Sequence, residues 1–348
     1  MPYFTIVLMK VLIRFWLYIL ISSGLIACDV GQGSGTEAAK TGLNDTLGSA
    51  IDITGVTIGY STPSLNAPFY VVLSQYIEKY AEAYGMSFVM ADGQDDIIKQ
   101  ITSMEDLISS GADIVILNPL DHKALVPAVN AAAESGLPVF IVDSRIDETA
   151  DYISSVQASN EGNGWLIGEW ASNELSDREI KVALISGSQG NPVGQSKRLG
   201  FFEGFIENQL MTRGFSDLKI LAQGWGNWTL LGGIEAMEDI LTAHPEVNLL
   251  LAENDAMAMG ALKAIEEAGK ASEILVAGYD GQKEAYELIM EGRYGATALN
   301  SPGELARLVV ESVVKYKNGI RLDKVIHTPA VIITKDNVDK YYDPDALF

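Results

Sequence analysis

Residues 249–261 read LLLAENDAMAMGA, and this stretch decides the fold. The run 249–253 opens with uninterrupted apolar residues, which is typical of a strand buried on both faces. Polar Asn254 and Asp255 come next, and a helical pattern of apolar residues then covers 255–268. A buried strand followed directly by a helix is the repeating unit of a parallel α/β sheet.

The same alternation extends over the chain on both sides of this stretch. The apolar runs predict strands at 56–61, 88–91, 114–118, 139–143, 182–186, 220–223, 249–253, 274–279 and 296–299. Helices are predicted at 70–84, 95–109, 124–134, 164–175, 200–210, 230–241 and 255–268. We therefore expect an α/β protein with doubly wound parallel sheets. Such sheets bind ligands at the carboxyl ends of their strands, so the polar residues that follow each strand are the candidate site residues.

The N-terminal region has the features of an export signal. Lys10 and Arg14 precede an apolar run at 15–27 that ends in small residues. The run is too short to cross a bilayer, which takes about 20 apolar residues. Its last residues, Leu25-Ile26-Ala27-Cys28, resemble the lipobox of bacterial lipoproteins, in which the cysteine is acylated and becomes the mature N-terminus.

This resemblance implies a signal peptide at 1–27 and a lipidated Cys28. The segment 28–52 is rich in Gly, Ser, Thr and Asn, which predicts a flexible tether. A transmembrane anchor or a buried cysteine is the alternative for this region. Met9 is a second candidate for the start of the chain besides Met1.

The charge of the chain excludes several classes of partner. The formal net charge is −22, and it becomes −24 without Lys10 and Arg14. An acidic protein of this kind repels nucleic acid and anionic lipid headgroups, so neither is expected as a direct ligand. The membrane is expected as a partner only through the lipid anchor. The residues after the tether are too many for one small core and suit two lobes.

Motifs for catalysis or metal binding are missing from the sequence. His122, His244 and His327 form no recognisable site, and no His-Glu-x-x-His, Walker loop or Gly-x-Ser-x-Gly occurs. The glycines at 31–35 follow no strand, so they belong to the tether. We expect no catalytic residue, no metal site and no cofactor.

Several strand ends, taken in order, resemble those of periplasmic sugar-binding proteins of the ribose and galactose type. These are type I periplasmic binding proteins, and they share their fold with the effector domains of lactose-repressor-like regulators. The resemblance extends from about residue 56 to 335. Its motifs are SLNAPFY at 64–70, ILNP at 116–119, LTAHP at 241–245, AENDAMAMGA at 252–261 and VAGYDG at 276–281.

The resemblance implies two similar α/β lobes joined by three crossings, with one ligand in the cleft between them. The N-terminal lobe is then 53–157 with 301–329, and the C-terminal lobe is 158–300 with 330–348. The crossings fall near 156–159, 300–301 and 329–330.

A sugar offers hydroxyl groups around apolar C–H faces, so it is bound by flat aromatic rings and by planar polar side chains. The resemblance implies this role for nine residues. They are Phe69, Tyr70, Asp143, Arg145, Arg198, Trp228, Asn254, Asp280 and Asn300.

Some of these assignments have alternatives. Phe69 is also explained as a core residue, and Asn254 or Asp280 as the cap of the helix that follows. For the Asn254-Asp255 pair we expect Asp255 to cap the helix and Asn254 to face the ligand.

The sequence also departs from the family pattern. Ser144 separates Asp143 from Arg145, so Arg145 either reaches the ligand from a shifted register or lies on the rim. The loop after the strand at 182–186 offers Gln195, Lys197 and Arg198 for one ligand position, and Arg198 is our choice over a surface role.

Two positions where the family has polar contacts carry Ala67 and Pro63 here. The ligand is therefore expected to differ from ribose while sharing its size and polarity.

The resemblance predicts a substrate-binding lipoprotein of an ABC transporter rather than an enzyme. It would capture a monosaccharide or similar polyol and deliver it to a membrane permease. We expect a monomer on the periplasmic or extracellular face of the cytoplasmic membrane. A sensory protein that presents a sugar or autoinducer to a chemoreceptor or sensor kinase is the alternative.

Overall fold

The computed structural model describes residues 53–348. The predicted signal peptide, tether and lipidated Cys28 lie outside these residues. Within 53–348, no helix is long and apolar enough to cross a membrane.

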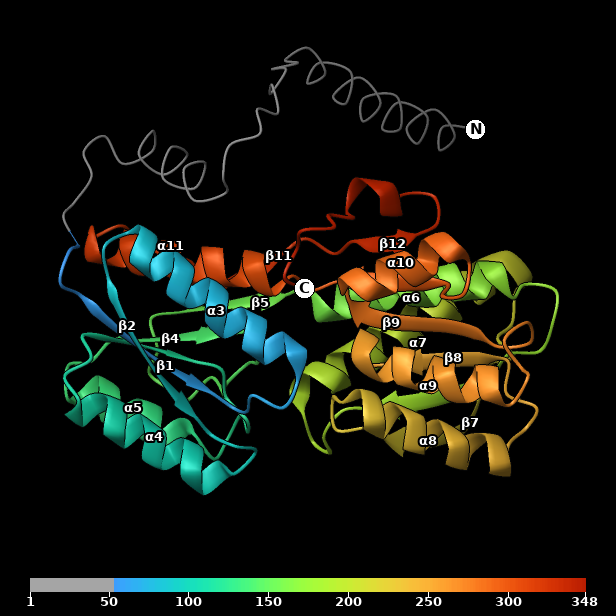
Figure 1. Cartoon of the computed structure of the whole chain (residues 1–348), viewed down its shortest axis with the longest axis horizontal. Helices are drawn as coiled ribbons and strands as arrows, with labels where there is room; N and C mark the ends of the chain where they lie inside the picture. Colours follow the sequence, from blue (N-terminus) through green and yellow to red (C-terminus); the bar gives the residue numbers. More distant parts are fainter. Residues whose placement is uncertain (1–52) are drawn as a thin grey trace, which may run out of the picture. The chain divides into compact units, whose positions relative to one another are not determined.

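Two six-stranded sheets form the body of the protein (Figure 1). All strands of the first sheet are parallel. Its order is β11 (Val325–Thr328), β5 (Ser154–Ala158), β4 (Val139–Val142), β3 (Ile114–Leu117), β1 (Thr57–Thr62) and β2 (Ser87–Asp92).

The second sheet is parallel except for one edge strand, β12, which runs antiparallel to β10. Its order is β12 (Ile332–Thr334), β10 (Ala296–Leu299), β9 (Leu275–Asp280), β8 (Leu249–Ala252), β6 (Lys181–Ser186) and β7 (Lys219–Trp225).

Helices cover both faces of each sheet, which confirms the predicted doubly wound α/β fold. The first sheet lies between α3 (Pro68–Ala83) with α11 (Pro302–Lys317) and α4 (Ile97–Ser109) with α5 (Val126–Glu134). The second lies between α6 (Asn160–Glu174) with α7 (Pro192–Arg213) and a layer formed by α8 (Leu230–Ala243), α9 (Asp255–Glu267) and α10 (Lys283–Glu291). A short 3-10 helix, η1 (Val338–Lys340), follows β12. We call each sheet with its helices the first lobe and the second lobe.

Alternate side chains of the buried strands pack on opposite faces of each sheet. In β4, Phe140 and Val142 pack with α3 and α11, whereas Val139 and Ile141 pack with α4 and α5. A strand that is buried on both faces needs apolar residues at every position, which explains its uninterrupted apolar sequence.

The chain passes between the two sheets three times. It leaves the first sheet after β5 to enter α6, returns after β10 to enter α11, and leaves again between β11 and β12. Each lobe is therefore assembled from segments that are distant in the sequence.

Strands β5, β11 and β12 and helices α10 and α11 are absent from the sequence-based prediction. Strand β5 is buried although it contains Ser154 and Ser155, so it lacks an apolar run. The hydroxyl of Ser154 donates to the carbonyl oxygen of Asp323 at 2.8 Å, which satisfies it in the interior.

Helix α7 begins eight residues before the predicted start at 200. Asn191 caps it by accepting from the backbone N–H groups of Val193 (2.9 Å) and Gly194 (3.2 Å), and Pro192 is its first residue. An Asn cap followed by Pro is a typical helix start. The earlier start brings Lys197 into the helix.

Helices α6 and α7 approach each other through glycines. A Cβ atom on Gly168 of α6 would overlap the backbone of Phe201, and one on Gly204 of α7 would overlap the backbone of Trp165. Close backbone approach of this kind tolerates no side chain at either position. The contact sets the position of α7 relative to the second sheet.

We expect Gly168→Ala to lower the free energy of unfolding by about 2 to 3 kcal/mol, since the added methyl group must push α6 and α7 apart. Denaturant unfolding measures the change. Gly303→Ala is the matched control, because its Cβ would meet only the Tyr76 ring at ordinary contact distance. Equal stability of both variants would contradict the close helix contact.

Candidate functional site

A cavity lies between the two lobes, where strand ends of both sheets meet. Residues of the first lobe, of the second lobe and of the crossing after β10 line it together. They are Ala67, Phe69, Tyr70, Asp143, Ser144, Asn191, Val193, Lys197, Trp228, Asn254, Asp280 and Asn300.

The first lobe contributes Asp143, which directly follows β4. Its backbone is left-handed, with φ of 62°, and the residue is only 5% exposed. Asn118 donates from Nδ2 to Asp143 Oδ2 at 3.0 Å, and the backbone N–H of Ser144 donates to Asn118 Oδ1 at 3.3 Å. Burial raises the pKa of Asp143 to about 6, against the lowering effect of the Asn118 hydrogen bond.

The second lobe places a buried cation in the cavity. The Lys197 ammonium donates to Asp280 Oδ1 at 3.0 Å and to the backbone carbonyl oxygen of Glu253 at 2.8 Å. Only 2% of its side chain is exposed. It also lies 5.8 Å from the centre of the Trp228 ring and 5.0 Å from that of Tyr279, at distances typical of cation–π contacts.

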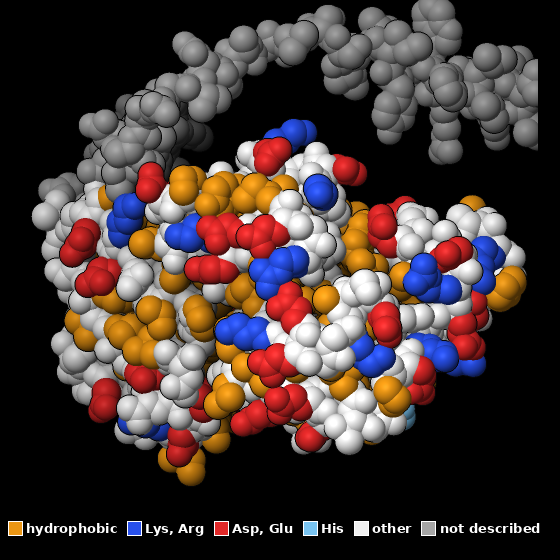
Figure 2. Space-filling view, turned by 45° about the vertical axis from the view of Figure 1, so that its right-hand side comes forward, with side chains coloured by type: hydrophobic (Ala, Val, Ile, Leu, Met, Phe, Trp, Pro, Cys, Tyr) orange, Lys and Arg blue, Asp and Glu red, His pale blue; other side chains and the backbone are white. Residues whose placement is uncertain are grey.

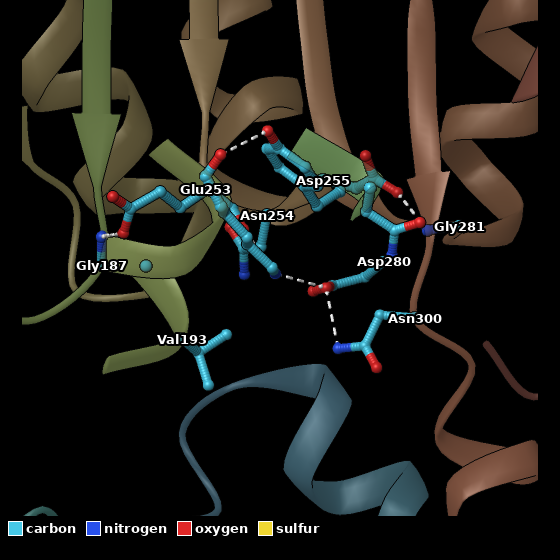
Figure 3. A network of polar contacts seen from close by, with 12 residues as sticks. Gly187, Val193, Glu253, Asn254, Asp255, Asp280, Gly281 and Asn300 are labelled. Carbon is cyan, nitrogen blue, oxygen red and sulfur yellow. Dashed lines mark hydrogen bonds and ion pairs between the residues drawn. The ribbon is translucent and has the colours of Figure 1, made fainter. Parts of the chain in front are cut away.

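Asp280 is the last residue of β9 and has φ of 109°. Asp255 binds the backbone of the turn that follows it (Figure 3). Asp255 Oδ2 accepts from the backbone N–H groups of Gly281 and Gln282, each at 2.8 Å. The Thr297 hydroxyl donates to the same oxygen at 2.9 Å. These bonds fix the turn after β9, so the Asp280 carboxylate is directed at Lys197 rather than at the helix that follows.

Asn300 lies at the crossing after β10 and contacts the Asp280 carboxylate. It donates from Nδ2 to Asp280 Oδ1 at 3.3 Å, as Figure 3 shows. Its Oδ1 is buried and has no hydrogen-bond partner among residues 53–348. A buried acceptor without a partner costs free energy, so a donor from a bound ligand would stabilise it.

Asn254 both lines the cavity and caps α9. Its Oδ1 accepts from the backbone N–H of Met257 at 2.9 Å, and its Nδ2 donates to the Trp228 carbonyl oxygen at 3.1 Å. The expected division of roles is therefore corrected, since Asn254 forms the cap and Asp255 binds the turn after Asp280. The second N–H of the Asn254 amide is not used by either bond.

Aromatic rings come to the cavity from both lobes. Phe69 and Tyr70 lie in the first turn of α3, edge to face, with ring centres 6.0 Å apart. Trp228 precedes α8 in a turn with φ of 64°. A Cβ atom on Gly187 would overlap the Trp228 indole, so the glycine after β6 makes room for this ring.

Seven of the nine predicted residues line this cavity, and their role in ligand binding stays a prediction. They are Phe69, Tyr70, Asp143, Trp228, Asn254, Asp280 and Asn300.

The two predicted arginines lie elsewhere. Arg145 is exposed and does not line the cavity. Arg198 forms an ion pair with buried Glu253 and donates to the Ser186 hydroxyl at 3.1 Å. Lys197 therefore takes the place in the cavity that the prediction gave to Arg198.

A sequence signal for Lys197 does exist. Lys197, Phe201 and Phe205 recur every four residues, and all three are fully buried on one side of α7. Because neighbouring residues of a helix point about 100° apart, the side that buries Lys197 turns Arg198 away. A predicted helix that begins at 200 excludes Lys197 and therefore hides this pattern.

Comparisons with known proteins agree with the fold. The family model described as "Periplasmic binding protein domain" matches residues 58–320. The ribose import binding protein of Bacillus subtilis (strain 168) is 33% identical over 282 residues, which cover 80% of this chain and 87% of that protein.

Two solved structures have similar folds. One is an ABC transporter solute binding protein from Mycobacterium smegmatis with bound glycerol, with a TM-score of 0.77, 30% identity, and coverage of 83% of this chain and 98% of that chain. The other is the Caulobacter myo-inositol binding protein bound to myo-inositol, with a TM-score of 0.76, 27% identity, and coverage of 82% and 95%.

Titration of Asp143 should be visible in the stability of the ligand-free protein. Its folded pKa of about 6 lies above the ordinary value of 3.8, so the folded chain binds this proton more tightly than the unfolded chain. Stability should therefore fall as the pH rises from about 4 to about 6, by up to about 3 kcal/mol.

The measurement is the free energy of unfolding against pH for the native chain and for Asp143→Asn. The asparagine keeps an acceptor for Asn118 but does not titrate. The difference between the two curves should slope downward between pH 4 and 6, and a flat difference would refute the raised pKa.

Proposed function

This chain belongs to the periplasmic binding protein family, and from that premise we propose that it is the sugar-binding component of an ABC importer. It captures a monosaccharide or similar polyol between its lobes and delivers it to a membrane permease. It acts outside the cytoplasm, on the periplasmic or extracellular side.

The observation that supports this function best is the composition of the interlobe cavity. Phe69 and Trp228 offer flat apolar surfaces from opposite lobes, which suit the C–H faces of a sugar. Asp143, Asp280 and Asn300 offer acceptors to hydroxyl groups, and Lys197 offers a donor. A ligand that is polar around its edge and apolar on its faces satisfies both sets.

Binding across the cavity would couple the ligand to lobe movement. Asp143 belongs to the first lobe and Asp280 to the second, so a ligand that bonds to both holds the lobes together. Such a ligand shifts the population towards the closed arrangement because its contacts with both lobes exist only there. The permease then recognises the surface that closure creates.

The charges in the cavity favour a neutral ligand. Two carboxylates, Asp143 and Asp280, face one ammonium group, that of Lys197. An additional carboxylate or phosphate on the ligand would be repelled at close range. The partnerless Asn300 Oδ1 also requires a donor, which a hydroxyl group supplies.

We further infer that Cys28 carries a lipid anchor and that the segment 28–52 tethers the lobes to the membrane.

The protein would act as a monomer without cofactor or catalytic step. Within residues 53–348, no cluster of three or more His, Cys, Asp or Glu side chains is arranged to hold a metal ion. Acidic side chains are spread among basic ones over the face shown in Figure 2, which suits neither nucleic acid nor anionic lipid as a partner.

The sensory alternative is not favoured. The relative from Bacillus subtilis is named as an import protein, and the structure from Mycobacterium smegmatis is described as part of an ABC transporter.

A thermal-shift panel of pentoses, hexoses, deoxysugars and polyols tests the proposed function. A ligand at 100 times its dissociation constant adds about 2.7 kcal/mol of stability, so a bound sugar should raise the melting temperature clearly. Trp228→Ala, which removes one stacking surface, should reduce that shift. A shift with amino acids or nucleosides, and with no sugar or polyol, would overturn the carbohydrate assignment.

The charge argument gives a separate prediction. Each neutral sugar that binds should bind at least about tenfold more tightly than its uronic or aldonic acid, because the acid adds a third carboxylate to the cavity. Calorimetry at pH 7.5 measures both affinities. Asp143→Asn removes one carboxylate from the cavity, so it should reduce the difference in affinity between the neutral sugar and its acid. Equal affinity of the native protein for both would rule out this electrostatic selection.

A further inference from the structure

The segment after β12 is anchored to the second lobe. Val338 of η1 is buried in the core of that lobe, and the Tyr342 hydroxyl donates to Glu287 Oε1 of α10 at 2.9 Å. Lys283 of α10 donates to the backbone carbonyl oxygens of Pro344 (3.3 Å) and Ala346 (3.1 Å). These contacts hold the chain on α10 up to residue 346.

Two residues later the chain contacts the other lobe. The ring of Phe348 packs edge to face against Phe69 of α3, with ring centres 5.7 Å apart and planes at 82°. Phe348 belongs to the apolar cluster of the first lobe. The end of the ribbon marked C accordingly lies between the two sheets in Figure 1.

Residues 338–348 therefore form a link between the lobes in addition to the three crossings. This link is anchored by hydrogen bonds on the second lobe and by one aromatic contact on the first. A groove beside Phe348 is lined by Tyr76 of the first lobe and by Tyr286 and Tyr341 of the second or its C-terminal segment. Phe348 is half-buried and lines this groove, so its ring is not enclosed by the core of either lobe.

The first-lobe end of the link is a residue of the ligand cavity. Phe69 lines the cavity, and its ring contacts Tyr70, which also lines it, and Phe348, which does not. Phe348 thus supports Phe69 from a position outside the cavity. Edge-to-face aromatic pairs are favourable beyond the area they bury, so the contact restricts both the Phe69 ring and the separation of the lobes.

We propose that Phe348 is a positioning residue for ligand binding. It holds Phe69 in the orientation that faces the ligand, and it biases the ligand-free lobes towards the arrangement in which both lobes line the cavity together. The ligand-binding part of this inference rests on the proposed function, whereas the bias of the ligand-free lobes does not. The apparent affinity of a two-state receptor rises with the fraction of molecules already in the binding-competent state.

The test compares Phe348→Ala with Leu347→Ala, the matched control. Leu347 is the neighbouring residue and is 58% exposed. Phe348→Tyr keeps the ring and should restore native behaviour, and Phe348→Leu keeps apolar bulk without the edge-to-face pair and should be intermediate.

The first readout uses no ligand. Fluorescence energy transfer is measured between dyes on cysteines introduced at Glu105 of α4 and Asp239 of α8, one in each lobe and both exposed. The full chain carries Cys28→Ser so that only these thiols react. Phe348→Ala should change the distribution towards separated lobes, whereas Leu347→Ala should match the native chain.

The second readout is the calorimetric affinity for D-ribose, or for the first sugar or polyol that raises the melting temperature. Phe348→Ala should weaken it about tenfold, which corresponds to about 1.4 kcal/mol. Native distributions and native affinity in a folded Phe348→Ala protein would overturn the proposal while leaving the proposed function intact. If no sugar or polyol binds the native chain, the proposed function fails, and the ligand-free distances decide whether Phe348 restrains the lobes.

Discussion

The candidate site depends on one buried ion pair, that of Lys197 with Asp280. An ammonium group removed from water is tolerated only when its charge and its N–H groups are satisfied. Here the carboxylate of Asp280 and the carbonyl oxygen of Glu253 do so, and Asn300 completes the surroundings of the carboxylate. The pair therefore joins α7, β8, β9 and the crossing after β10. Displacing any one of these segments would leave a buried charge without a partner, so the pair ties the second-lobe side of the cavity together.

Residues with a strained backbone also lie at the cavity. Among the described residues other than glycine, six have positive φ, and Asp143, Trp228 and Asp280 of this set line the cavity. Such conformations cost of order 1 kcal/mol or more and persist only where the surroundings enforce them. Each lobe presents one aspartate in this conformation at a strand end. The two lobes thus each place one carboxylate in the cavity.

The fold was predictable because buried parallel strands need apolar residues at every position, as in β3, β4 and β8. The polar residues after those strands were predictable for the same topological reason. Lys197 was not, because a charged residue in a buried helix position looks like a surface residue until the helix start is known. Strand β5 was missed because Ser154 and Ser155 are buried through hydrogen bonds and packing that the sequence alone does not reveal. The contact of Phe348 with Phe69 joins residues too distant in sequence for any local pattern.

The return of the chain to the first lobe has a consequence for folding order. The segment between the first and second crossings, which holds nearly all of the second lobe, is continuous and is synthesised as one block. The first lobe needs α11 to cover one face of its sheet and β11 to complete its edge, and both come near the end of the chain. Until they emerge, residues such as Phe140 and Val142 have no helix α11 to pack against. The first lobe therefore cannot be completed until nearly all of the second lobe has been made, and its exposed apolar face is the point at which a nascent chain would need protection from aggregation.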